Sequence, residues 1–296
     1  MAGRVSPRIW AMDGQTVLVT GTASGIGRAT AAALGRAGAT VLVHARDQTR
    51  AAAVAEELES RGGWFVPVSG DLGSLAGVRG LVEQVLHVTT NGLHVLVNNA
   101  GAAFSQRAVS PDGLERTLAV NHLAVAALTS ALLDALRDGA ALAGRPSRVV
   151  NLSSTVEKRG NPKLQDWTYP DHFSQLQAYS DSKLISLAHT YALARDLAGS
   201  GVTVNAANPG SVATAFGRNA GGILKVVQMV GKAFMAGAEK GAVTSIRLAS
   251  DPALDDATGG YYSAAELDRS SEASRDPAFG EQIYARTATI VAKTRP

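Results

Sequence analysis

The sequence has no cysteine among its 296 residues, which excludes disulfide bonds, thiolate metal sites and a cysteine nucleophile. Its six histidines are dispersed and form no pair with metal-ligand spacing, so we expect no metal site. Aromatic residues make up only 5% and charged residues 18%, whereas 46% of the residues are apolar. This composition favours a folded chain with a large core over a disordered one.

Long uninterrupted apolar runs are also lacking. The first fourteen residues contain no apolar segment of the kind found in signal peptides. The most apolar long stretch, residues 117–136, is interrupted by Asn121, His122 and Asp134, which favours a buried helix over a membrane span. We therefore expect a cytoplasmic protein without stable membrane insertion.

A strong excess of one charge is absent as well. The net charge is only +3, and the Lys and Arg residues are scattered along the chain. This pattern argues against a nucleic-acid-binding surface and is compatible with an anionic cofactor.

What the sequence does contain is a series of short apolar runs separated by Ala- and Leu-rich stretches of helical character. The runs are residues 16–20, 40–45, 64–69, 94–98, 148–153 and 202–209. Continuous Val and Leu runs are typical of parallel strands covered on both faces, and their alternation with helices predicts βαβ units. We predict a single α/β domain over residues 1–296, a Rossmann-type doubly wound parallel sheet flanked by helices on both faces.

A glycine-rich segment, TGTASGIG, follows the first predicted strand directly and opens a helix. A glycine cluster alone indicates no more than a tight turn, but this context is the one that a dinucleotide site requires. Backbone N–H groups can approach a pyrophosphate there, and the helix N-terminus supplies positive potential. The predicted cofactor contacts in this segment are Gly21, Ser24, Gly25, Ile26 and Gly27.

The end of the second predicted strand, VLVHARD, bears on which dinucleotide binds. An acidic residue there would bind the ribose hydroxyls of NAD, whereas an arginine would accommodate the 2′-phosphate of NADP. Arg46 precedes Asp47, and its fork of donors suits a phosphate, so we predict NADP(H) in preference to NAD(H). The alternative is a plain pair of surface charges. Asp71 and Leu72, after the third strand, would flank the adenine.

Polar residues follow the later strands too. In NNAG, after the fourth strand, Asn98, Ala100 and Gly101 would let the backbone pack close to the cofactor and tie neighbouring strands together. NLSS ends the fifth strand and brings Ser154 to the edge where ligands of open α/β sheets bind. Because no G-x-S-x-G elbow is present, Ser154 is interpreted as a hydrogen-bond donor, not a nucleophile.

After the sixth strand, NPGSVAT forms a rigid turn that could hold a nicotinamide carboxamide. The predicted contacts there are Pro209, Gly210, Val212 and Thr214.

The segment AYSDSK places Tyr179 and Lys183 four positions apart in a predicted helix. The simplest interpretation is a tyrosine ring packed under the aliphatic part of a lysine on a helix surface. The alternative is an acid whose pKa is lowered by a fixed cation. Asn121, inside an apolar helix, is either a buried structural amide or a proton-relay residue.

These segments occur in the order found in short-chain dehydrogenases/reductases, which the sequence resembles from about residue 13 to residue 263. It resembles most the branch of the retinol dehydrogenases and the WW-domain oxidoreductase, because Ser154 and Tyr179 are 25 positions apart, more than in most members. The resemblance implies that Tyr179 is the general acid or base, and that Lys183 holds the nicotinamide ribose and lowers the pKa of Tyr179. It also implies that Ser154 binds the substrate oxygen and that Asn121 positions a water molecule.

By the same resemblance the chain is an NADP(H)-dependent oxidoreductase. It would reduce a carbonyl group, or oxidise the matching secondary alcohol, of a fairly large apolar small molecule such as a secondary metabolite. Two other functions stay open: an isomerase or lyase that retains its cofactor, and a dinucleotide sensor without turnover. The complete set of Asn121, Ser154, Tyr179 and Lys183 argues against the sensor. The sequence does not specify the oligomeric state, and a homo-oligomer stays open.

Two segments are expected to shape the substrate site. Residues 215–238 correspond to the substrate lid of the family, and the chain departs from retinol dehydrogenases in showing no N-terminal membrane segment, which argues against a membrane-lipid substrate. The inserted loop, residues 155–178, contains Trp167, Tyr169 and Phe173, of which we predict one or more to line the pocket. The alternative is that these rings pin the loop to the domain.

Overall fold

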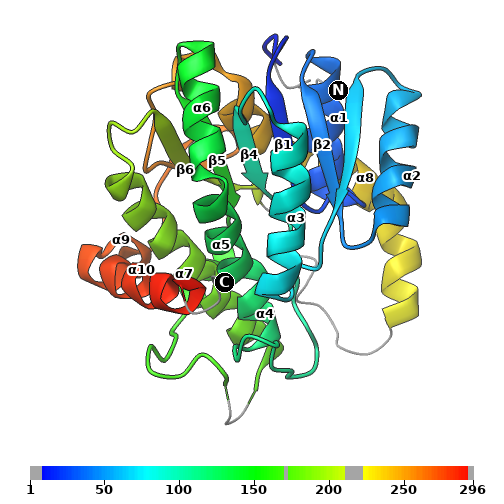
Figure 1. Ribbon diagram of the computed structural model, residues 1–296. Coiled ribbons are helices and arrows are strands. Elements are labelled where there is room, and N and C mark those ends of the chain that lie inside the picture. The colour runs from blue at the N-terminus through cyan, green and yellow to red at the C-terminus, as the bar shows by residue number, and fades with distance from the viewer. Residues whose placement is uncertain (1–8, 170–172, 211–222, 293–296) are drawn as a thin grey trace.

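The computed structural model describes residues 9–169, 173–210 and 223–292, with the backbone alone for 223–236. At its centre lies an eight-stranded sheet of order β3-β2-β1-β4-β5-β6-β7-β8 (Figure 1). The strands are β1 (Thr16–Val19), β2 (Thr40–Ala45), β3 (Trp64–Ser69), β4 (Val95–Asn98), β5 (Ser147–Leu152), β6 (Val202–Asn208), β7 (Tyr261–Ser263) and β8 (Glu266–Asp268). The strands pair in parallel from β3 to β7, and β8 runs antiparallel to β7.

This order confirms the predicted Rossmann-type doubly wound sheet. All six apolar runs are strands whose ends lie within one residue of the prediction. The hairpin of β7 and β8 is not predicted, because strands of three residues are too short to produce a recognisable apolar run.

Helices cover both faces of the sheet (Figure 1). They are α1 (Gly25–Arg36), α2 (Gln48–Glu59), α3 (Leu75–Val88), α4 (Arg116–Leu118), α5 (Ala124–Ala131), α6 (Leu133–Ala143), α7 (Gln175–Asp196), α8 (Ile223–Ser250), α9 (Glu272–Arg275) and α10 (Pro277–Ala292). Helices α1, α2 and α8 pack on one face, and α3, α5 and α7 pack on the other, with α10 against α7.

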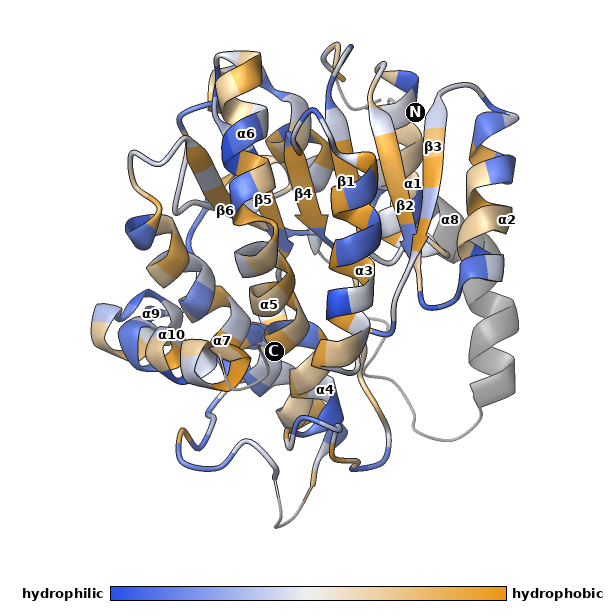
Figure 2. Ribbon diagram, viewed as in Figure 1, coloured by the Kyte–Doolittle hydropathy of each residue, from blue (hydrophilic) through white to orange (hydrophobic). Residues whose placement is uncertain are grey.

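Alternation along the strands creates two cores, because successive side chains point to opposite faces of a sheet. Leu18 of β1 and Leu42 of β2 belong to the core shared with α3, α5 and α7. Val17 and Val41, one position earlier, belong to the core shared with α1, α2 and α8. Figure 2 shows apolar residues along the whole length of these strands, which is what burial on both faces requires.

The apolar stretch 117–136 is not the single helix that the sequence predicts. It is divided into α4, the π-helical turn η1 (Ala119–Leu123), α5 and the start of α6. π-turns of this kind insert an extra residue into a helix and are frequent at functional sites. In the described part of the chain no single helix is long and apolar enough to cross a membrane, and only the bent pair 116–131 and 133–143 passes by length and composition.

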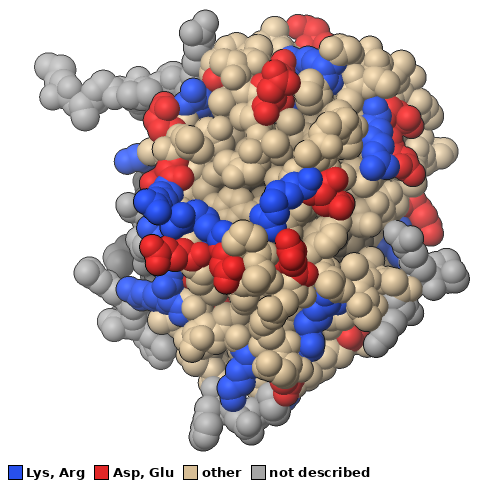
Figure 3. Space-filling model, turned by 90° about the vertical axis from the view of Figure 1, so that its left-hand side faces the viewer, with Lys and Arg blue, Asp and Glu red and all other residues tan. Residues whose placement is uncertain are grey.

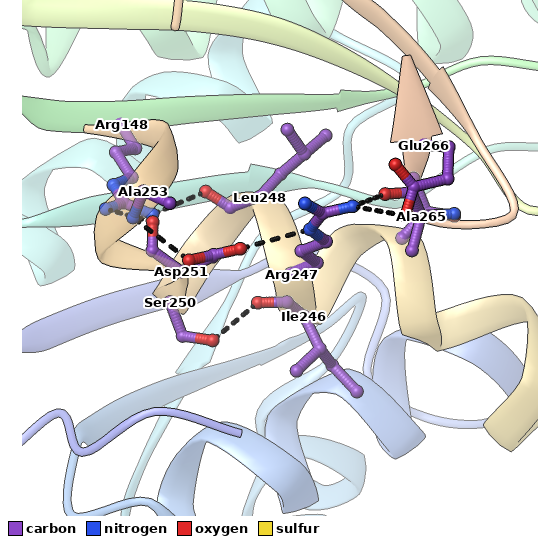
Figure 4. Close-up of polar contacts among 10 residues, drawn as sticks. Arg148, Ile246, Arg247, Leu248, Ser250, Asp251, Ala253, Ala265 and Glu266 are labelled. Carbon is purple, nitrogen blue, oxygen red and sulfur yellow. Dashed lines mark hydrogen bonds and ion pairs between the residues drawn. The ribbon is translucent and has the colours of Figure 1, made fainter. Parts of the chain in front are cut away.

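The C-terminal end of α8 is fixed to the sheet by two arginines (Figure 4). The buried guanidinium of Arg148, on β5, donates to the carbonyl oxygens of Leu248 at 3.0 Å and Asp251 at 2.9 Å. Arg247 of α8 donates to the carboxylate of Asp251 at 3.1 Å and to that of Glu266 on β8 at 2.8 Å. Helix α8 is therefore held against β5 and β8 at this end.

The predicted lid, 215–238, lies partly outside the described residues. Its described part, 223–238, forms the first turns of α8, which continues without a break to Ser250.

Charges of both signs are interspersed on the face of the molecule that lies to the left in Figure 1. On this face Lys and Arg side chains lie beside Asp and Glu side chains (Figure 3). Such pairs neutralise one another locally and leave no stripe of a single sign there.

Candidate active site

The predicted site residues come together at the carboxyl edge of the sheet. Strand β1 pairs with β2 on one side and with β4 on the other, so the strand order reverses there, which is where open α/β sheets bind their ligands. The described members follow β1, β2, β3, β4, β5 and β6 in turn. Two predicted cofactor contacts, Val212 and Thr214, lie outside the described residues.

The glycine-rich turn after β1 leads directly into α1. Ser24 occupies the N-cap position in an extended conformation, with φ −166°, and its side chain makes no capping hydrogen bond. The first N–H groups of α1, from Gly25 and Ile26 onward, are therefore not occupied by this hydroxyl. A helix N-terminus with open donors and positive potential suits a pyrophosphate, so this segment fits a dinucleotide.

Close packing explains two of the glycines. Gly21 has φ +72°, and a Cβ there would lie 2.9 Å from the Cα of Ala100. A Cβ on Gly27 would lie 2.3 Å from the amide nitrogen of Asn99. That amide in turn donates to the carbonyl oxygen of Thr20 at 2.8 Å, so the turn after β1 and the segment after β4 interlock. Larger residues would push α1 away from the strand ends.

The ends of β2 and β3 carry the adenosine-side candidates. Arg46 is exposed, whereas the Asp47 carboxylate caps α2 by accepting a hydrogen bond from the backbone N–H of Arg50 at 2.9 Å. The carboxylate of Asp71 accepts from the backbone N–H of Gly73 at 3.0 Å. The side chain of Leu72 is packed in the core, so any contact with an adenine would have to come from its backbone.

In the segment after β4, Asn98 is a structural residue, whereas Gly101 is a point where the chain packs closely against the site. Asn98 is buried and donates to Thr129 at 3.0 Å and to Asn151 at 2.9 Å. Its side chain therefore ties β4 to β5 and α5, and faces the core. A Cβ on Gly101 would lie 3.3 Å from the Asn121 amide oxygen and 3.8 Å from Nζ of Lys183.

Ser154, Tyr179 and Lys183 meet where β5 ends against α7. Ser154 is buried, and its hydroxyl hydrogen-bonds the side chain of Tyr179. Nζ of Lys183 lies 5.8 Å from the centre of the Tyr179 ring and donates to the carbonyl oxygen of Leu152, the last residue of β5, at 2.8 Å. Lys183 is only 4% exposed, so the pair is not an ordinary helix surface.

The predicted lowering of the pKa of Tyr179 is opposed by burial in this geometry. Burial raises the pKa of Tyr179 above its usual value, and the hydrogen bond with Ser154 only partly opposes this. The lysine does not reverse the shift, because its ammonium is directed at the carbonyl of Leu152. Burial also lowers the pKa of Lys183 itself to about 8, which reduces its charge near neutral pH.

Asn121 lies on the π-helical turn η1 and holds the chain after β4. Its amide oxygen accepts from the backbone N–H of Ala102 at 2.8 Å. Its amide nitrogen donates to the carbonyl oxygen of Ala102 at 2.8 Å and to the hydroxyl of Ser182 at 2.9 Å. Both amide hydrogens are thus engaged within the protein, and the side chain has the character of a structural amide.

Comparison with known proteins agrees with this geometry. A family model described as short chain dehydrogenase matches residues 15–222. Retinol dehydrogenase 14 of Mus musculus is 37% identical over 266 residues, which is 85% of this chain and 78% of that protein. The chain belongs to the short-chain dehydrogenase/reductase family. The predicted resemblance to its retinol dehydrogenase branch is thereby confirmed.

Two solved structures of the same fold are similar. A crystal structure of an uncharacterised protein from Mycobacterium paratuberculosis has a TM-score of 0.78 and 28% identity, and covers 96% of each chain. The Pseudomonas aeruginosa RhlG structure with NADP has a TM-score of 0.66 and 28% identity, over 91% of this chain and 98% of that one. A short-chain dehydrogenase/reductase is an oxidoreductase that uses a nicotinamide dinucleotide on a small molecule, and this chain is one.

The inserted loop of this family member is pinned to the protein, which corrects one prediction. Trp167 is only 2% exposed and packs in the core, where His122 meets its ring edge-on at 5.6 Å between centroids. The guanidinium of Arg286, on α10, lies 4.7 Å above the same ring. Trp167 therefore does not line a substrate pocket, because its ring is enclosed between η1 and α10.

A second attachment holds the loop to α7. The carboxylate of Asp181, 1% exposed, accepts from the backbone N–H of Asn161 at 2.6 Å, from the hydroxyl of Tyr169 at 2.8 Å and from Gln177 at 2.7 Å. Burial and the nearby carboxylate raise the pKa of Tyr169. Of the three loop rings, Phe173 alone stays a candidate for the pocket wall.

Sequence reasoning missed two residues of the site. Asn99 donates to the glycine-rich turn, and His44 of β2 contacts both that turn and the end of β3. His44 carries a recognisable signal, since a histidine inside a continuous apolar strand must find hydrogen-bond partners. Asn99 carries none, because either asparagine of NNAG could have been the inward one.

A cavity of about 250 Å³ lies elsewhere, between α5, α7 and α10. Its lining includes His189, Tyr284 and Thr287 and contains none of the predicted site residues. The chemistry of the family is therefore to be sought at the strand ends and not in this cavity.

Proposed function

We propose that this protein is an NADP(H)-dependent oxidoreductase that reduces a carbonyl group, or oxidises the matching secondary alcohol, of a fairly large apolar small molecule. The observation that carries the proposal is the buried group at the end of β5. There the Tyr179 hydroxyl is hydrogen-bonded by Ser154, and Lys183 lies behind the ring. A proton donor beside a second donor is what a carbonyl oxygen needs as negative charge develops on it.

The bound nicotinamide would supply or accept the hydride. Ser154 and Tyr179 would bind the substrate oxygen together, and Tyr179 would give its proton to that oxygen during reduction. Because burial raises the pKa of Tyr179, the phenol stays protonated over a wide range, which suits an acid. For alcohol oxidation the phenol oxygen of Tyr179 must first lose its proton, so oxidation should be favoured at higher pH.

Lys183 would have two tasks. Its Nζ would donate to the hydroxyls of the nicotinamide ribose, and its charge would stabilise the tyrosinate in the oxidative direction. Asn121 keeps the proposed role of positioning a water molecule for proton resupply. With both amide hydrogens of its side chain already engaged, its remaining acceptor sites or its backbone would have to do so.

The different surroundings of Arg46 and Asp47 at the end of β2 support the proposed preference for NADP(H). Arg46 is exposed at the strand end, whereas Asp47 is engaged as the cap of α2 and so is a poor partner for ribose hydroxyls. The similar RhlG structure carries NADP. A free guanidinium suits a 2′-phosphate better than a diol.

The proposed substrate class is inferred from the name of a relative. The relative's name, retinol dehydrogenase, names an apolar alcohol. We propose that the chain works as one domain over residues 1–296, with residues 215–238 as a lid over an apolar substrate and Phe173 on the loop side. The covering of a reacting centre by a lid excludes water and strengthens its electrostatics.

The test is a screen of purified protein with apolar ketones, aldehydes and alcohols, following the absorbance of reduced cofactor and identifying the product. With a substrate found, Tyr179→Phe should lower kcat about 10²- to 10⁴-fold, because no proton donor remains. NADPH affinity should be unchanged. Substantial activity in the Phe variant would overturn the mechanism. Turnover without net cofactor oxidation would indicate an isomerase or lyase, and tight binding without any turnover a sensor.

A further inference from the structure

His44 is a buried histidine of β2 that lies between three strand ends. It is 3% exposed, and its backbone carbonyl accepts from both the N–H and the hydroxyl of Thr22, at 2.9 Å and 3.0 Å. Thr22 belongs to the glycine-rich turn after β1. The strand carrying His44 is thus bound to that turn through its backbone as well as through its ring.

The ring has two partners, and both are backbone groups. The N–H of Gly21 lies 3.1 Å from Nδ1, and the carbonyl oxygen of Gly70, just after β3, lies 2.9 Å from Nε2. A backbone N–H can only donate and a carbonyl can only accept. Nδ1 must therefore be the bare acceptor and Nε2 must carry the proton. These partners select one neutral tautomer of His44.

Gly21 has little freedom to adapt if the ring changes. Its φ is +72°, and a Cβ built on it would lie 2.9 Å from the Cα of Ala100, so it is confined between β1 and the segment after β4. Its N–H loses its only described acceptor if Nδ1 gains a proton, since two N–H groups would then face each other. Either the ring or the glycine-rich turn must move.

The surroundings favour the neutral ring. Burial lowers the pKa of His44, while its hydrogen bond to Gly70 and the charge of Asp71, after β3, act in the opposite direction. The turn from residue 20 to residue 27 carries no titratable side chain, and Arg46 lies two positions further along the chain, just after the end of β2. Protonation is therefore expected only below the usual range of a histidine, where it would meet a site arranged for the neutral form.

We propose that His44 is a positioning residue of the cofactor site, whose neutral imidazole holds the first amide of the glycine-rich turn so that protonation of His44 weakens dinucleotide binding. This inference rests on the proposed function, because it takes the glycine-rich turn to bind the dinucleotide. It adds a residue, and a pH dependence of affinity, that the motif itself does not contain.

The chain provides a matched control in His94. Its Nδ1 accepts from the backbone N–H of Thr16 at 3.0 Å, so the same ring atom binds the same kind of donor. Thr16, however, is the first residue of β1 and lies at the opposite edge of the sheet, away from the glycine-rich turn. Burial lowers the pKa of His94 as well. If a histidine of this kind affected only the stability of the protein, substitution of His44 and substitution of His94 would have the same consequence.

The experiment measures the Kd of NADPH by fluorescence at pH 7.5 and at pH 5.5 for the parent, His44→Asn and His94→Asn. Asparagine offers an oxygen to the Gly21 N–H but cannot take up a proton. The 2′-phosphate titrates in this range too, so the informative quantity is the difference between the proteins. Between these pH values the Kd of the parent should rise about three- to tenfold more than that of His44→Asn, the effect of one hydrogen bond. His94→Asn should follow the parent.

A second readout is independent of the cofactor. In the unliganded protein at pH 7.5, imidazole nitrogen NMR should show a bare Nδ1 and a protonated Nε2 for His44. The opposite tautomer, or equal pH profiles in the parent and His44→Asn, would overturn the proposal. If His44→Asn does not fold, as judged by melting, His44→Gln takes its place. Failure of the parent to bind NADPH or NADH at pH 7.5 would instead overturn the proposed function.

Discussion

The buried position of Lys183 lowers the stability of the folded protein. Its amine is enclosed between the ring of Tyr179 and the end of β5, where it donates to the carbonyl oxygen of Leu152, and the residue is 4% exposed. Among the described residues no carboxylate pairs with it, so the ammonium loses hydration without gaining a counter-charge. A buried ammonium of this kind is characteristic of residues retained for chemistry at the expense of stability.

Replacement of this lysine by methionine should stabilise the unliganded protein at neutral pH. The pKa of Lys183 is lowered from 10.5 to about 8, so the unfolded chain binds more protons between these values. The unfolding free energy of the parent should rise with pH in this window, and the penalty should be complete below pH 8. Lys183→Met should therefore be more stable than the parent at pH 7 by up to about 3 kcal/mol, and the difference should shrink by pH 10.

Denaturant unfolding of both proteins at pH 7 and pH 10 measures this difference. The methionine variant should at the same time lose turnover and cofactor affinity. A variant that is less stable than the parent at both pH values would show that the bond to Leu152 outweighs the cost of burial.

Arg46 is expected to decide between the two dinucleotides. Arg46→Asp should weaken NADPH binding at least about tenfold more than NADH binding, because the carboxylate would repel a 2′-phosphate but accept from ribose hydroxyls. Titration of both cofactors gives the two affinities. Arg137→Asp, at an exposed ion pair on α6, makes the same charge change away from the strand ends and should leave both affinities unchanged. Equal losses for NADPH and NADH would show that Arg46 does not contact the 2′-phosphate.

At the scale of elements, the inserted loop is fastened at both ends of its described part. Trp167 anchors it to η1 and α10, and its carbonyl oxygen accepts from the backbone N–H of Glu115 at 2.8 Å. Asp181 anchors the loop to α7 at Asn161, before Trp167, and at Tyr169, after it. The loop thus behaves as part of the scaffold that supports Tyr179.

Trp167→Ala should therefore act on stability. Removal of a fully enclosed aromatic ring typically costs about 3–5 kcal/mol, through lost burial and the cavity left behind. At a temperature where the variant is folded, its substrate KM should equal that of the parent. Phe173→Ala, on the same loop but only half-buried, should show the reverse, a changed KM with little loss of melting temperature. Melting curves and steady-state kinetics on both variants separate the two roles, and a KM change confined to Trp167→Ala would contradict them.

At the scale of the whole molecule, buried histidines make stability depend on pH. Burial lowers the pKa of His44, His94 and His122 and brings that of His189 to about 4. His122 and His189 meet edge-on at 5.2 Å between centroids under the C-terminal helix, where Nε2 of His122 lies 2.7 Å from the hydroxyl of Thr287. A second proton there would place a charge in a buried site and would disturb the contact of α10 with α7.

The sign of the effect follows from these lowered values. The stability contributed by each neutral histidine is complete above the unfolded value near 6.5 and is lost as the pH falls below it. We expect the unfolding free energy to fall between pH 6.5 and pH 5 by up to about 1.4 kcal/mol per pH unit for each such histidine. His189→Gln should reduce this slope, whereas His87→Gln, at an exposed position on α3, should not. Denaturant unfolding over this range measures the slopes, and identical slopes would refute the assignment.

Sequence pattern alone was sufficient for the architecture and for the location of the site. Continuous apolar runs identify parallel strands, and right-handed crossovers leave few ways to order them, so the polar residues that follow each run must gather at one edge. Ser154 and the turn after β1 are predicted in this way, whereas Tyr179 and Lys183 are predicted from their spacing in a helix and from the family resemblance. Their roles, like the cofactor preference, stay predictions for the experiments above.

Only the tertiary structure decided which of these side chains face the site and what their surroundings do to them. Trp167, Leu72 and Asn98 turn into the core because partners distant in the sequence enclose them. Burial raises the pKa of Tyr179, and the ammonium of Lys183 is directed at the carbonyl oxygen of Leu152, neither of which the spacing along the helix reveals. Burial and hydrogen bonding are properties of contacts between segments, and no local pattern specifies them.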